Sequence, residues 1–267
     1  MRRILATFLF LAIALPSSVL GQATAPAGSR VESNVVYGMY SGLALLMDVH
    51  YPQKPNGYGI IYIGGSGWYA PMSYDAKPLK DHGPSFTYGN PLLDAGYTLF
   101  VINHRSAPRF RYPAAVEDAQ RAVRYIRHYA AKYGMRADRI GAVGASSGGH
   151  LVSLLGVLDG EGDPQDADPV NRESARVQCV VAFYPATDFI NGQPRAQEYN
   201  PDGPGLLGFI GMERPSEGAS PTSVEYKTYR EASPIYHVSA DDAPHLLIHG
   251  TTDIVVPIKH SELMERG

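Results

Sequence analysis

Short apolar runs alternate with longer amphipathic stretches through most of this chain. The runs at 60–63, 97–102 and 177–183 are apolar at most positions, as in strands buried on both faces of a parallel sheet. The clearest helical pattern spans 114–133, where apolar residues recur at steps of three and four before Gly134. This alternation predicts an α/β fold with a mainly parallel, doubly wound sheet.

The stretches outside this alternation have patterns of their own. Two β-rich runs, 35–40 and 43–51, flank a Ser-Gly pair and predict an N-terminal antiparallel hairpin. Residues 69–90 show no clear period, so we expect a loop or small helix over the sheet edge, followed by a short helix at 91–96. The stretch 191–230, rich in Gly, Pro and charge, is predicted to be an insertion beside the functional site.

The N-terminus has the pattern of a secretory signal peptide. Arg2 and Arg3 precede an apolar run at 4–15, and small residues follow it. We therefore expect residues 1–25 to be a signal peptide, and the protein to be secreted or periplasmic, with no stable membrane anchor after cleavage. Residues 31–267 are then one α/β domain.

Composition narrows the classes of function. The 267 residues, 44% of them hydrophobic, suffice for one sizeable core, and the net charge of −3 gives no reason to expect nucleic acid as a partner. Cys179 is the single cysteine, so no intrachain disulfide can form, and its apolar run predicts a small buried side chain. The acidic stretch 159–176 has no EF-hand spacing and is expected to be a solvated loop rather than a calcium site.

The strongest chemical signal is a G-x-S-x-G motif at 144–148, between an apolar run and an apolar segment. This order predicts a strand, a sharp turn and a helix, with Ser146 at the apex of the turn. Gly144 and Gly148 allow the turn to close, and the Ser147 amide at the helix start would face a developing oxyanion. Because Gly and Ser are common here, the motif alone is a weak signal, and its context carries the prediction.

Two further segments fit the same chemistry. The Gly-rich loop 64–68 directly follows a buried strand, where its backbone amides could stabilise an anion. Near the end of the chain, the apolar run 245–249 leads into a loop that contains Asp253. Ser146 and Asp253 would both lie past the carboxyl ends of strands, where such sheets bind ligands, and the order of serine before acid is that of α/β-hydrolases.

From about residue 35 onward the chain resembles α/β-hydrolase esterases of the hormone-sensitive-lipase-like and acetyl-xylan or feruloyl esterase-like (BD-FAE-like) group. The blocks at 45–52, 109–118, 144–151 and 233–257 are similar to four motifs of that group. The resemblance implies Ser146 as nucleophile and Asp253 as the acid that orients a histidine. It also implies the amides of Gly65, Ser66 and Ser147 as the oxyanion hole.

The chain departs from the group's pattern at two places. The usual H-G-G-G-W loop begins here with Gly64 in place of histidine, which leaves the backbone amides available but puts the rigidity of the loop in doubt. In the group, the catalytic histidine follows one more strand after the acid. Here His260 is the one histidine after Asp253, and its place in a helix predicts a surface residue rather than the base.

The other histidines do not occupy the expected place either. His150, just after the elbow, is expected to be structural, His249 to lie in the turn after its strand, and His104 to lie at a strand end near the site. Our hypothesis is that the sequence lacks the final strand, the catalytic histidine and the last helix. Loss of that strand would expose apolar surface at the sheet edge.

The combined expectation is a secreted serine esterase that cleaves short acyl esters, with acetylated or feruloylated polysaccharide as the substrate class that the resemblance favours. No cofactor or metal is expected. Two alternatives stay open: an amide hydrolase of the peptidase or arylformamidase type, and a degenerate hydrolase fold that binds an ester or glycan without turnover.

Overall fold

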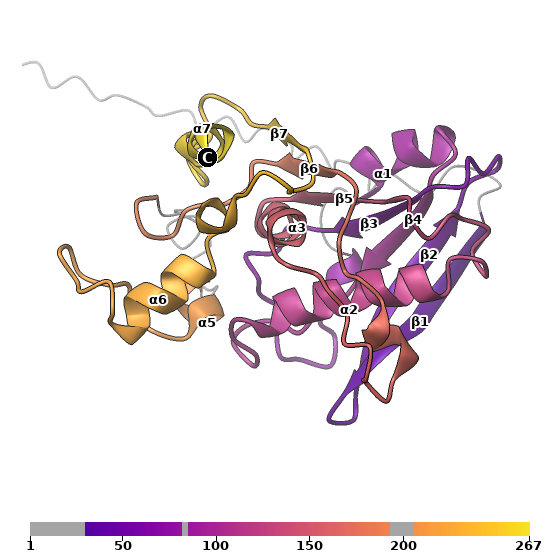
Figure 1. The fold of residues 1–267 in the computed structure, drawn as a ribbon, viewed down its shortest axis with the longest axis horizontal. Coiled ribbons are helices and arrows are strands. Elements are labelled where there is room, and N and C mark those ends of the chain that lie inside the picture. Colours follow the sequence, from indigo (N-terminus) through magenta and orange to yellow (C-terminus); the bar gives the residue numbers. More distant parts are fainter. Residues whose placement is uncertain (1–29, 82–84, 193–204) are drawn as a thin grey trace, which may run out of the picture.

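A single twisted sheet organises the molecule (Figure 1). The computed structural model describes residues 30–81, 85–192 and 205–267. Within these ranges the strand order is β1-β2-β4-β3-β5-β6-β7. Strand β1 is antiparallel to β2, and β2 is antiparallel to β4. The five strands β4, β3, β5, β6 and β7 are parallel to one another. The strands are β1 (Arg30–Tyr40), β2 (Leu43–Tyr51), β3 (Gly59–Ile63), β4 (Thr98–Ile102), β5 (Ile140–Ala145), β6 (Val180–Phe183) and β7 (His245–Ile248).

The predicted hairpin is confirmed, and so are the buried strands expected at 60–63 and 97–102, whereas the strand expected at 177–183 is only partly buried. Tyr40 pairs with Leu43 across a two-residue turn in which Ser41 and Gly42 have φ of 47° and 83°, as the common hairpin turn with two positive φ angles requires. Every residue of β3, β4 and β5 is buried. These central strands therefore have the continuous apolar pattern of a sheet that is covered on both faces.

Helices cover both faces of the sheet (Figure 1). The larger core packs α2 and α3 against one face, and the smaller core packs α1 against the other, where Ile60, Leu99 and Val143 meet Leu93. The α-helices are α1 (Ser85–Asp94), α2 (Ala114–His128), α3 (Ser147–Val157), α5 (Gly205–Ile210), α6 (Val224–Glu231) and α7 (Lys259–Arg266), and short 3₁₀ helices lie at Leu79–Asp81, Pro169–Arg172 and Pro234–His237.

Three predicted helix and strand boundaries are wrong. The helix expected at 91–96 is α1, which begins at Ser85 and contains Pro91. Packing of its apolar side chains against β3 and β4 overrides the poor helix propensity of Gly89 and Pro91. Helix α2 ends at His128 rather than 133, and turns lead on to Gly134 at a φ of 66°. The strand expected from 177 begins at Val180.

The environment of Cys179 also differs from the prediction. Its thiol is exposed, not buried. The backbone carbonyl of Cys179 still accepts a hydrogen bond from the Ala142 amide of β5, at 2.9 Å, so the segment follows the sheet while the side chain points away from the core. The apolar run in the sequence therefore located the strand, but Cys179 lies just before β6, and its exposure is not visible in the run.

Two predicted segments fall partly or wholly outside the described ranges. The signal peptide expected at 1–25 lies outside them, as do residues 193–204 of the predicted insertion. The rest of that insertion forms α5 and α6. In the part of the chain that the structure describes, no helix has the length and apolar character needed to cross a bilayer.

Candidate active site

Ser146 lies at a strained turn between β5 and α3. Its backbone has φ 54° and ψ −121°, a conformation that costs a non-glycine residue about 1–3 kcal/mol. A Cβ atom on Gly148 would lie 2.0 Å from the Ile63 carbonyl oxygen, and one on Gly144 would lie 2.4 Å from that of Gly148. Only glycine fits at these two places, so the G-x-S-x-G spacing is a packing requirement of the turn.

The Gly-rich loop after β3 approaches this turn closely. A Cβ atom on Gly65 would lie 2.9 Å from the Ala145 carbonyl oxygen and 3.0 Å from the Cβ of Ser146. The backbone of Gly65 is therefore beside the candidate nucleophile, where the sequence analysis expects an oxyanion donor. This close approach follows from the pairing of β3 with β5, in which Ile63 lies opposite Gly144.

The Ser66 amide has a partner that the sequence did not reveal. It donates a 2.8 Å hydrogen bond to the hydroxyl oxygen of Ser147, the first residue of α3. The Ser147 side chain is buried. Of the three amides expected to form the oxyanion hole, the one on Ser66 is thus bound to α3, and the bond fixes the loop against the helix.

His150 supports the other end of this loop. Its Nδ1 accepts a 3.0 Å hydrogen bond from the Trp68 indole, and its Nε2 donates to the Ala232 carbonyl oxygen at 2.7 Å. Burial lowers the pKa of His150 to about 4, so the ring is neutral in this arrangement. The structural role expected for His150 is confirmed.

The insertion packs onto the same loop. Phe209 of α5 stacks on Trp68 with ring centroids 4.8 Å apart and an interplanar angle of 17°. Phe189, in the segment after β6, meets Trp68 edge-on at 5.6 Å. These contacts place the described part of the insertion beside the candidate site, as the sequence predicts.

Asp253 lies in the loop that follows β7. One carboxylate oxygen accepts hydrogen bonds from the amides of Val255 and Val256, at 2.8 and 2.9 Å. The other lies 3.7 Å from Nε2 of His249. Since β5, β6 and β7 are adjacent and parallel, Ser146 and Asp253 both follow strands at the carboxyl edge of the sheet, and the two strands β5 and β7 lie about 10 Å apart.

Tyr184 lies between them, directly after β6, with a φ of 40°. Burial raises the pKa of the Tyr184 hydroxyl, and the neighbouring Tyr88 hydroxyl at 3.4 Å and the negative charge of Asp253 act in the same direction. The phenol therefore stays protonated at neutral pH. The sequence gave no signal for this residue beyond its position after a strand.

The prediction that His260 is a surface residue is wrong. Its side chain is 1% exposed, and Nδ1 accepts hydrogen bonds from the amides of Thr187 and Asp188 at 3.1 and 3.2 Å. The Thr187 hydroxyl in turn donates to the His260 carbonyl oxygen at 2.6 Å. Burial lowers the pKa of His260 to about 4, against the opposing effect of Asp188. The buried face of α7 explains the difference, since packing against the loop after β6 is not visible in the sequence.

The remaining histidines near the carboxyl edge are also held by structural contacts. His249 donates from Nε2 to the Val256 carbonyl oxygen and accepts at Nδ1 from the Ser261 hydroxyl, both at 2.7 Å. His104 is buried, with Nδ1 2.9 Å from the Arg105 carbonyl oxygen. Among the described residues, no hydrogen bond joins a histidine to Ser146.

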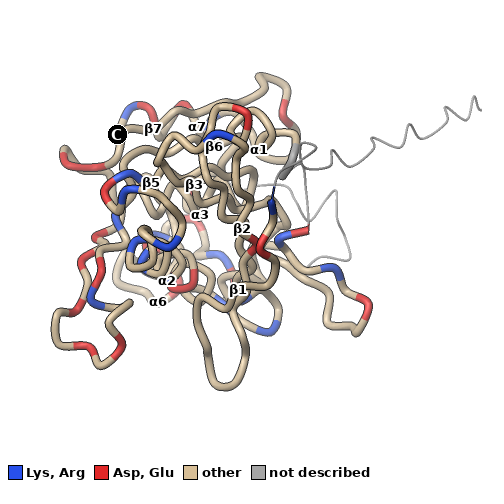
Figure 2. The backbone as a smooth tube through the Cα atoms, turned by 90° about the vertical axis from the view of Figure 1, so that its right-hand side faces the viewer, with Lys and Arg blue, Asp and Glu red and all other residues tan. Residues whose placement is uncertain are grey.

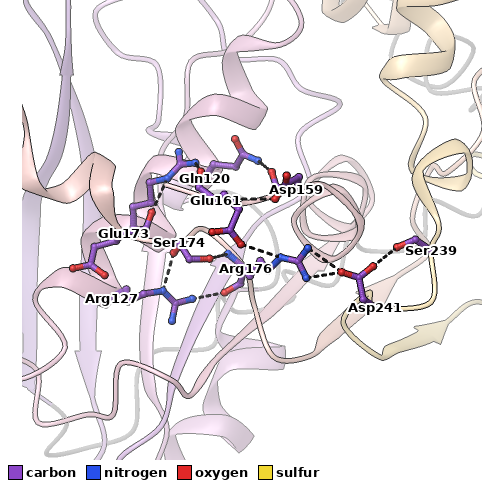
Figure 3. A network of polar contacts seen from close by, with 10 residues as sticks. Gln120, Arg127, Asp159, Glu161, Glu173, Ser174, Arg176, Ser239 and Asp241 are labelled. Atoms are coloured by element: carbon purple, nitrogen blue, oxygen red, sulfur yellow. Dashed lines mark hydrogen bonds and ion pairs between the residues drawn. The ribbon is translucent and has the colours of Figure 1, made fainter. Parts of the chain in front are cut away.

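Arginines of α2 hold the acidic stretch 159–176. Arg127 of α2 donates to the carbonyl oxygens of Ser174 and Arg176, and Arg176 pairs with Asp241 at 3.1 Å (Figure 3). Basic and acidic positions lie beside one another around α2 (Figure 2). In the described ranges, no group of three His, Cys, Asp or Glu side chains is arranged to hold a metal ion.

Comparison with known families fits this geometry. Residues 47–267 match the sequence profile of the BD-FAE family. The chain belongs to the BD-FAE family. Esterases are among its relatives: the probable carboxylic ester hydrolase LipM of Mycobacterium tuberculosis is 31% identical over 70% of this chain and 38% of its own length. Esterase LipC of the same organism is 27% identical over 85% of this chain and 52% of its own length. The chain thus spans about half the length of these relatives, or less.

Solved structures give the same fold. A truncated form of a carbohydrate esterase from gut microbiota superposes with a TM-score of 0.70 at 29% identity, over 89% of this chain and 82% of its own. An acetyl ester-xyloside bifunctional hydrolase from Caldicellulosiruptor lactoaceticus superposes with a TM-score of 0.64 at 28% identity, over 84% and 71%. This BD-FAE chain therefore has the α/β-hydrolase fold that its sequence predicts.

Proposed function

We propose that this BD-FAE chain is the hydrolytic domain of a serine esterase that removes short acyl groups from carbohydrate. The observation that carries the proposal is Ser146 at its strained turn, with the backbone of Gly65 against its Cβ atom. Esterases among the relatives and carbohydrate esterases among the solved structures support the same class of reaction.

In the proposed reaction the Ser146 hydroxyl oxygen attacks the ester carbonyl. The amides of Gly65 and Ser147 stabilise the negative charge on the carbonyl oxygen. The bond between the carbonyl carbon and the sugar oxygen then breaks, and the proton removed from Ser146 passes to the departing sugar oxygen, which becomes a hydroxyl group. Water attacks the acyl-enzyme next, releases the carboxylic acid and restores Ser146.

The contacts of the described residues do not include a general base for the Ser146 hydroxyl. A serine hydroxyl needs a partner that accepts its proton, and a general base contributes about 10²–10⁴-fold to such a step. Both His249 and His260 hold their Nδ1 acceptors in other hydrogen bonds. This observation favours a second candidate function, in which the chain binds an ester or glycan without turnover.

Chemical rescue tests the proposal. We expect the chain to hydrolyse p-nitrophenyl acetate faster than a Ser146→Ala variant, and added imidazole to increase the Ser146-dependent rate by about tenfold or more, because it supplies the base. A p-nitroanilide of the same acid should be cleaved far more slowly if the chain is an esterase rather than an amide hydrolase.

Each outcome decides between the candidates. Equal rates for the chain and the Ser146→Ala variant, with and without imidazole, would contradict the esterase proposal if both proteins have the same circular dichroism spectrum. A Ser146-dependent rate that imidazole does not change would mean that a histidine of this chain already reaches the serine.

A further inference from the structure

The side chain of Ser66, in the Gly-rich loop after β3, takes no part in the contacts that fix this loop. Its hydroxyl oxygen is buried from solvent and has no hydrogen-bond partner among the described residues. Buried polar groups of folded proteins nearly always have a partner, so a hydroxyl without one needs an explanation. Beside a candidate nucleophile, the explanation can be catalytic, because a bound substrate brings oxygen atoms that accept hydrogen bonds.

 Both backbone groups of Ser66 are bound within the protein. The amide donates to the Ser147 hydroxyl oxygen at 2.8 Å. The carbonyl oxygen accepts a 3.2 Å hydrogen bond from the Tyr69 amide, which closes a tight turn. The two central residues of that turn, Gly67 and Trp68, have φ of 63° and 58°. These contacts fix the backbone and leave the hydroxyl as the polar group of Ser66 that a substrate can bind.

Two contacts place this hydroxyl beside the nucleophile. The amide nitrogen of Ser66 touches the side chain of Ser147, which directly follows Ser146. The preceding residue, Gly65, lies against the nucleophile, because a Cβ atom on it would be 3.0 Å from the Cβ of Ser146. Consecutive Cα atoms are about 3.8 Å apart, and a serine hydroxyl oxygen is separated from its own Cα only by Cβ. The Ser66 hydroxyl is therefore next to the place where an ester carbonyl would be attacked.

The charge that develops in the proposed reaction suits a hydroxyl donor. When Ser146 attacks an ester, the carbonyl oxygen becomes negative and accepts hydrogen bonds from donors that are already in position. The Ser147 amide is such a donor, because it opens the 11-residue helix α3 and has no partner within that helix. A donor acts most strongly where water is excluded, and the burial of the Ser66 hydroxyl meets this condition.

We propose that the Ser66 hydroxyl is the third donor to the oxyanion, beside the amides of Gly65 and Ser147. The inference rests on the proposed esterase function and adds a catalytic side chain to it. The hydroxyl donates a hydrogen bond and keeps its proton, so no bond of Ser66 forms or breaks. The Ser147 hydroxyl then has a positioning role, because it holds the Ser66 amide and leaves the side chain to act in place of that amide.

Substitutions at these two serines test the assignment through p-nitrophenyl acetate turnover in the presence of imidazole. We expect Ser66→Ala to lower kcat by about tenfold to a hundredfold with little change in KM, because an oxyanion donor acts on the transition state. Ser66→Thr keeps a hydroxyl and should retain most of the rate. Adding Ser147→Ala to Ser66→Ala should restore part of the rate, because the amide of residue 66 then loses its partner and can donate to the oxyanion. Losses from a purely structural role would add instead.

Binding of phenylboronic acid provides a measurement that needs no turnover. Its boron atom forms a bond to the Ser146 oxygen, the serine proton passes to the buffer, and the tetrahedral adduct carries a negative charge like that of the transition state. In calorimetric titrations we expect Ser66→Ala to weaken the affinity by about tenfold and Ser146→Ala to abolish binding. Ser153→Ala is the matched control, because the Ser153 hydroxyl donates to the Gly149 carbonyl oxygen within α3, and it should leave the affinity unchanged.

The outcomes separate this inference from the proposed function. Ester turnover with the same kcat in the chain and in Ser66→Ala would overturn the hydroxyl donor and leave the esterase function in place. Additive losses in the double variant would overturn it as well. Boronate binding that depends on Ser66, without ester turnover, would support the donor and remove only the esterase function. Absence of boronate binding to the chain would overturn the donor, because the site would then not hold a tetrahedral anion.

Discussion

At the scale of single residues, the bond between Ser66 and Ser147 is the feature that most distinguishes this site from its predicted form. A serine after the nucleophile gives α3 a hydroxyl that reaches the Gly-rich loop, and the Ser66 amide donates to it at 2.8 Å. The bond offsets one consequence of Gly64, which stands where the resemblance leads us to expect histidine. The loop keeps a fixed position through α3 instead.

Removing this hydroxyl should therefore loosen the loop. We expect Ser147→Ala to lower the free energy of unfolding by about 1 kcal/mol, the usual net contribution of one hydrogen bond. Ser153→Ala is the matched control, because the buried Ser153 hydroxyl only donates to the Gly149 carbonyl oxygen within the same helix. Urea denaturation measures both, and equal losses would contradict a special role for the Ser147 hydroxyl.

The sequence predicted the environment of some site residues but not of others. Ser146 and its two flanking glycines could be predicted because the turn is made by neighbours in the chain, and steric contacts dictate their types. The burial of His260 could not, because it depends on where α7 lies against the loop after β6. The partner of the Ser66 amide likewise lies 81 residues away.

At the scale of elements, α2 holds the acidic stretch 159–176 through its arginines. Arg124 donates to the carbonyl oxygens of Glu173 and Glu161, both at 3.1 Å, and Arg121 pairs with Asp168 at 2.7 Å. Arg127 donates to the carbonyl oxygens of Ser174, Ala137 and Arg176. The stretch is therefore fixed chiefly by its backbone, and its carboxylates add surface ion pairs.

This difference predicts unequal effects of two arginines in Figure 3. Arg127→Ala should lower the free energy of unfolding by about 2–3 kcal/mol, because it leaves three carbonyl oxygens without a charged donor. Arg176→Ala should have a much smaller effect than Arg127→Ala, because the pair of Arg176 with Asp241 is exposed and screened by solvent. Urea denaturation in low and high salt provides the comparison. A larger loss for Arg176→Ala would contradict this ranking.

Elements were predicted best where their pattern is repetitive. The central strands and α2 have clear apolar periods, whereas α1 contains Gly89 and Pro91 and was expected to begin six residues later. Its helical form depends on contacts of Leu93 with the sheet. The sequence therefore located the elements whose apolar residues recur regularly. It failed for α1, whose boundary depends on tertiary packing.

At the scale of the whole molecule, the order of strands brings together residues that are distant in sequence. Ser146, the Gly-rich loop and Asp253 meet at one edge because β3, β5, β6 and β7 are parallel neighbours. The sequence predicted this edge from the alternation of strands and helices. It predicted a structural role for His150, which is confirmed, but not the burial of His260.

These histidines connect separate parts of the fold. His150 of α3 links Trp68 to Ala232, and His260 of α7 binds the loop after β6. Both rings are neutral in the folded protein, because burial lowers the pKa of each to about 4. Protonation of either Nδ1 would remove the acceptor of a buried hydrogen bond.

Folding stability should consequently fall in mild acid. An unfolded histidine titrates near 6.5, so between pH 6.5 and 4 the unfolded chain binds more protons than the folded one. The stabilisation is complete above pH 6.5 and is lost as the pH falls to 4, by up to about 3 kcal/mol for each ring. His260→Asn, which keeps an acceptor but cannot titrate, should reduce the loss by about half, and His237→Gln, at a half-buried histidine outside both contacts, is the control variant. Urea denaturation at pH 7.0, 5.5 and 4.5 measures the dependence, and the same slope in the chain and in His260→Asn would show that this buried ring does not control it.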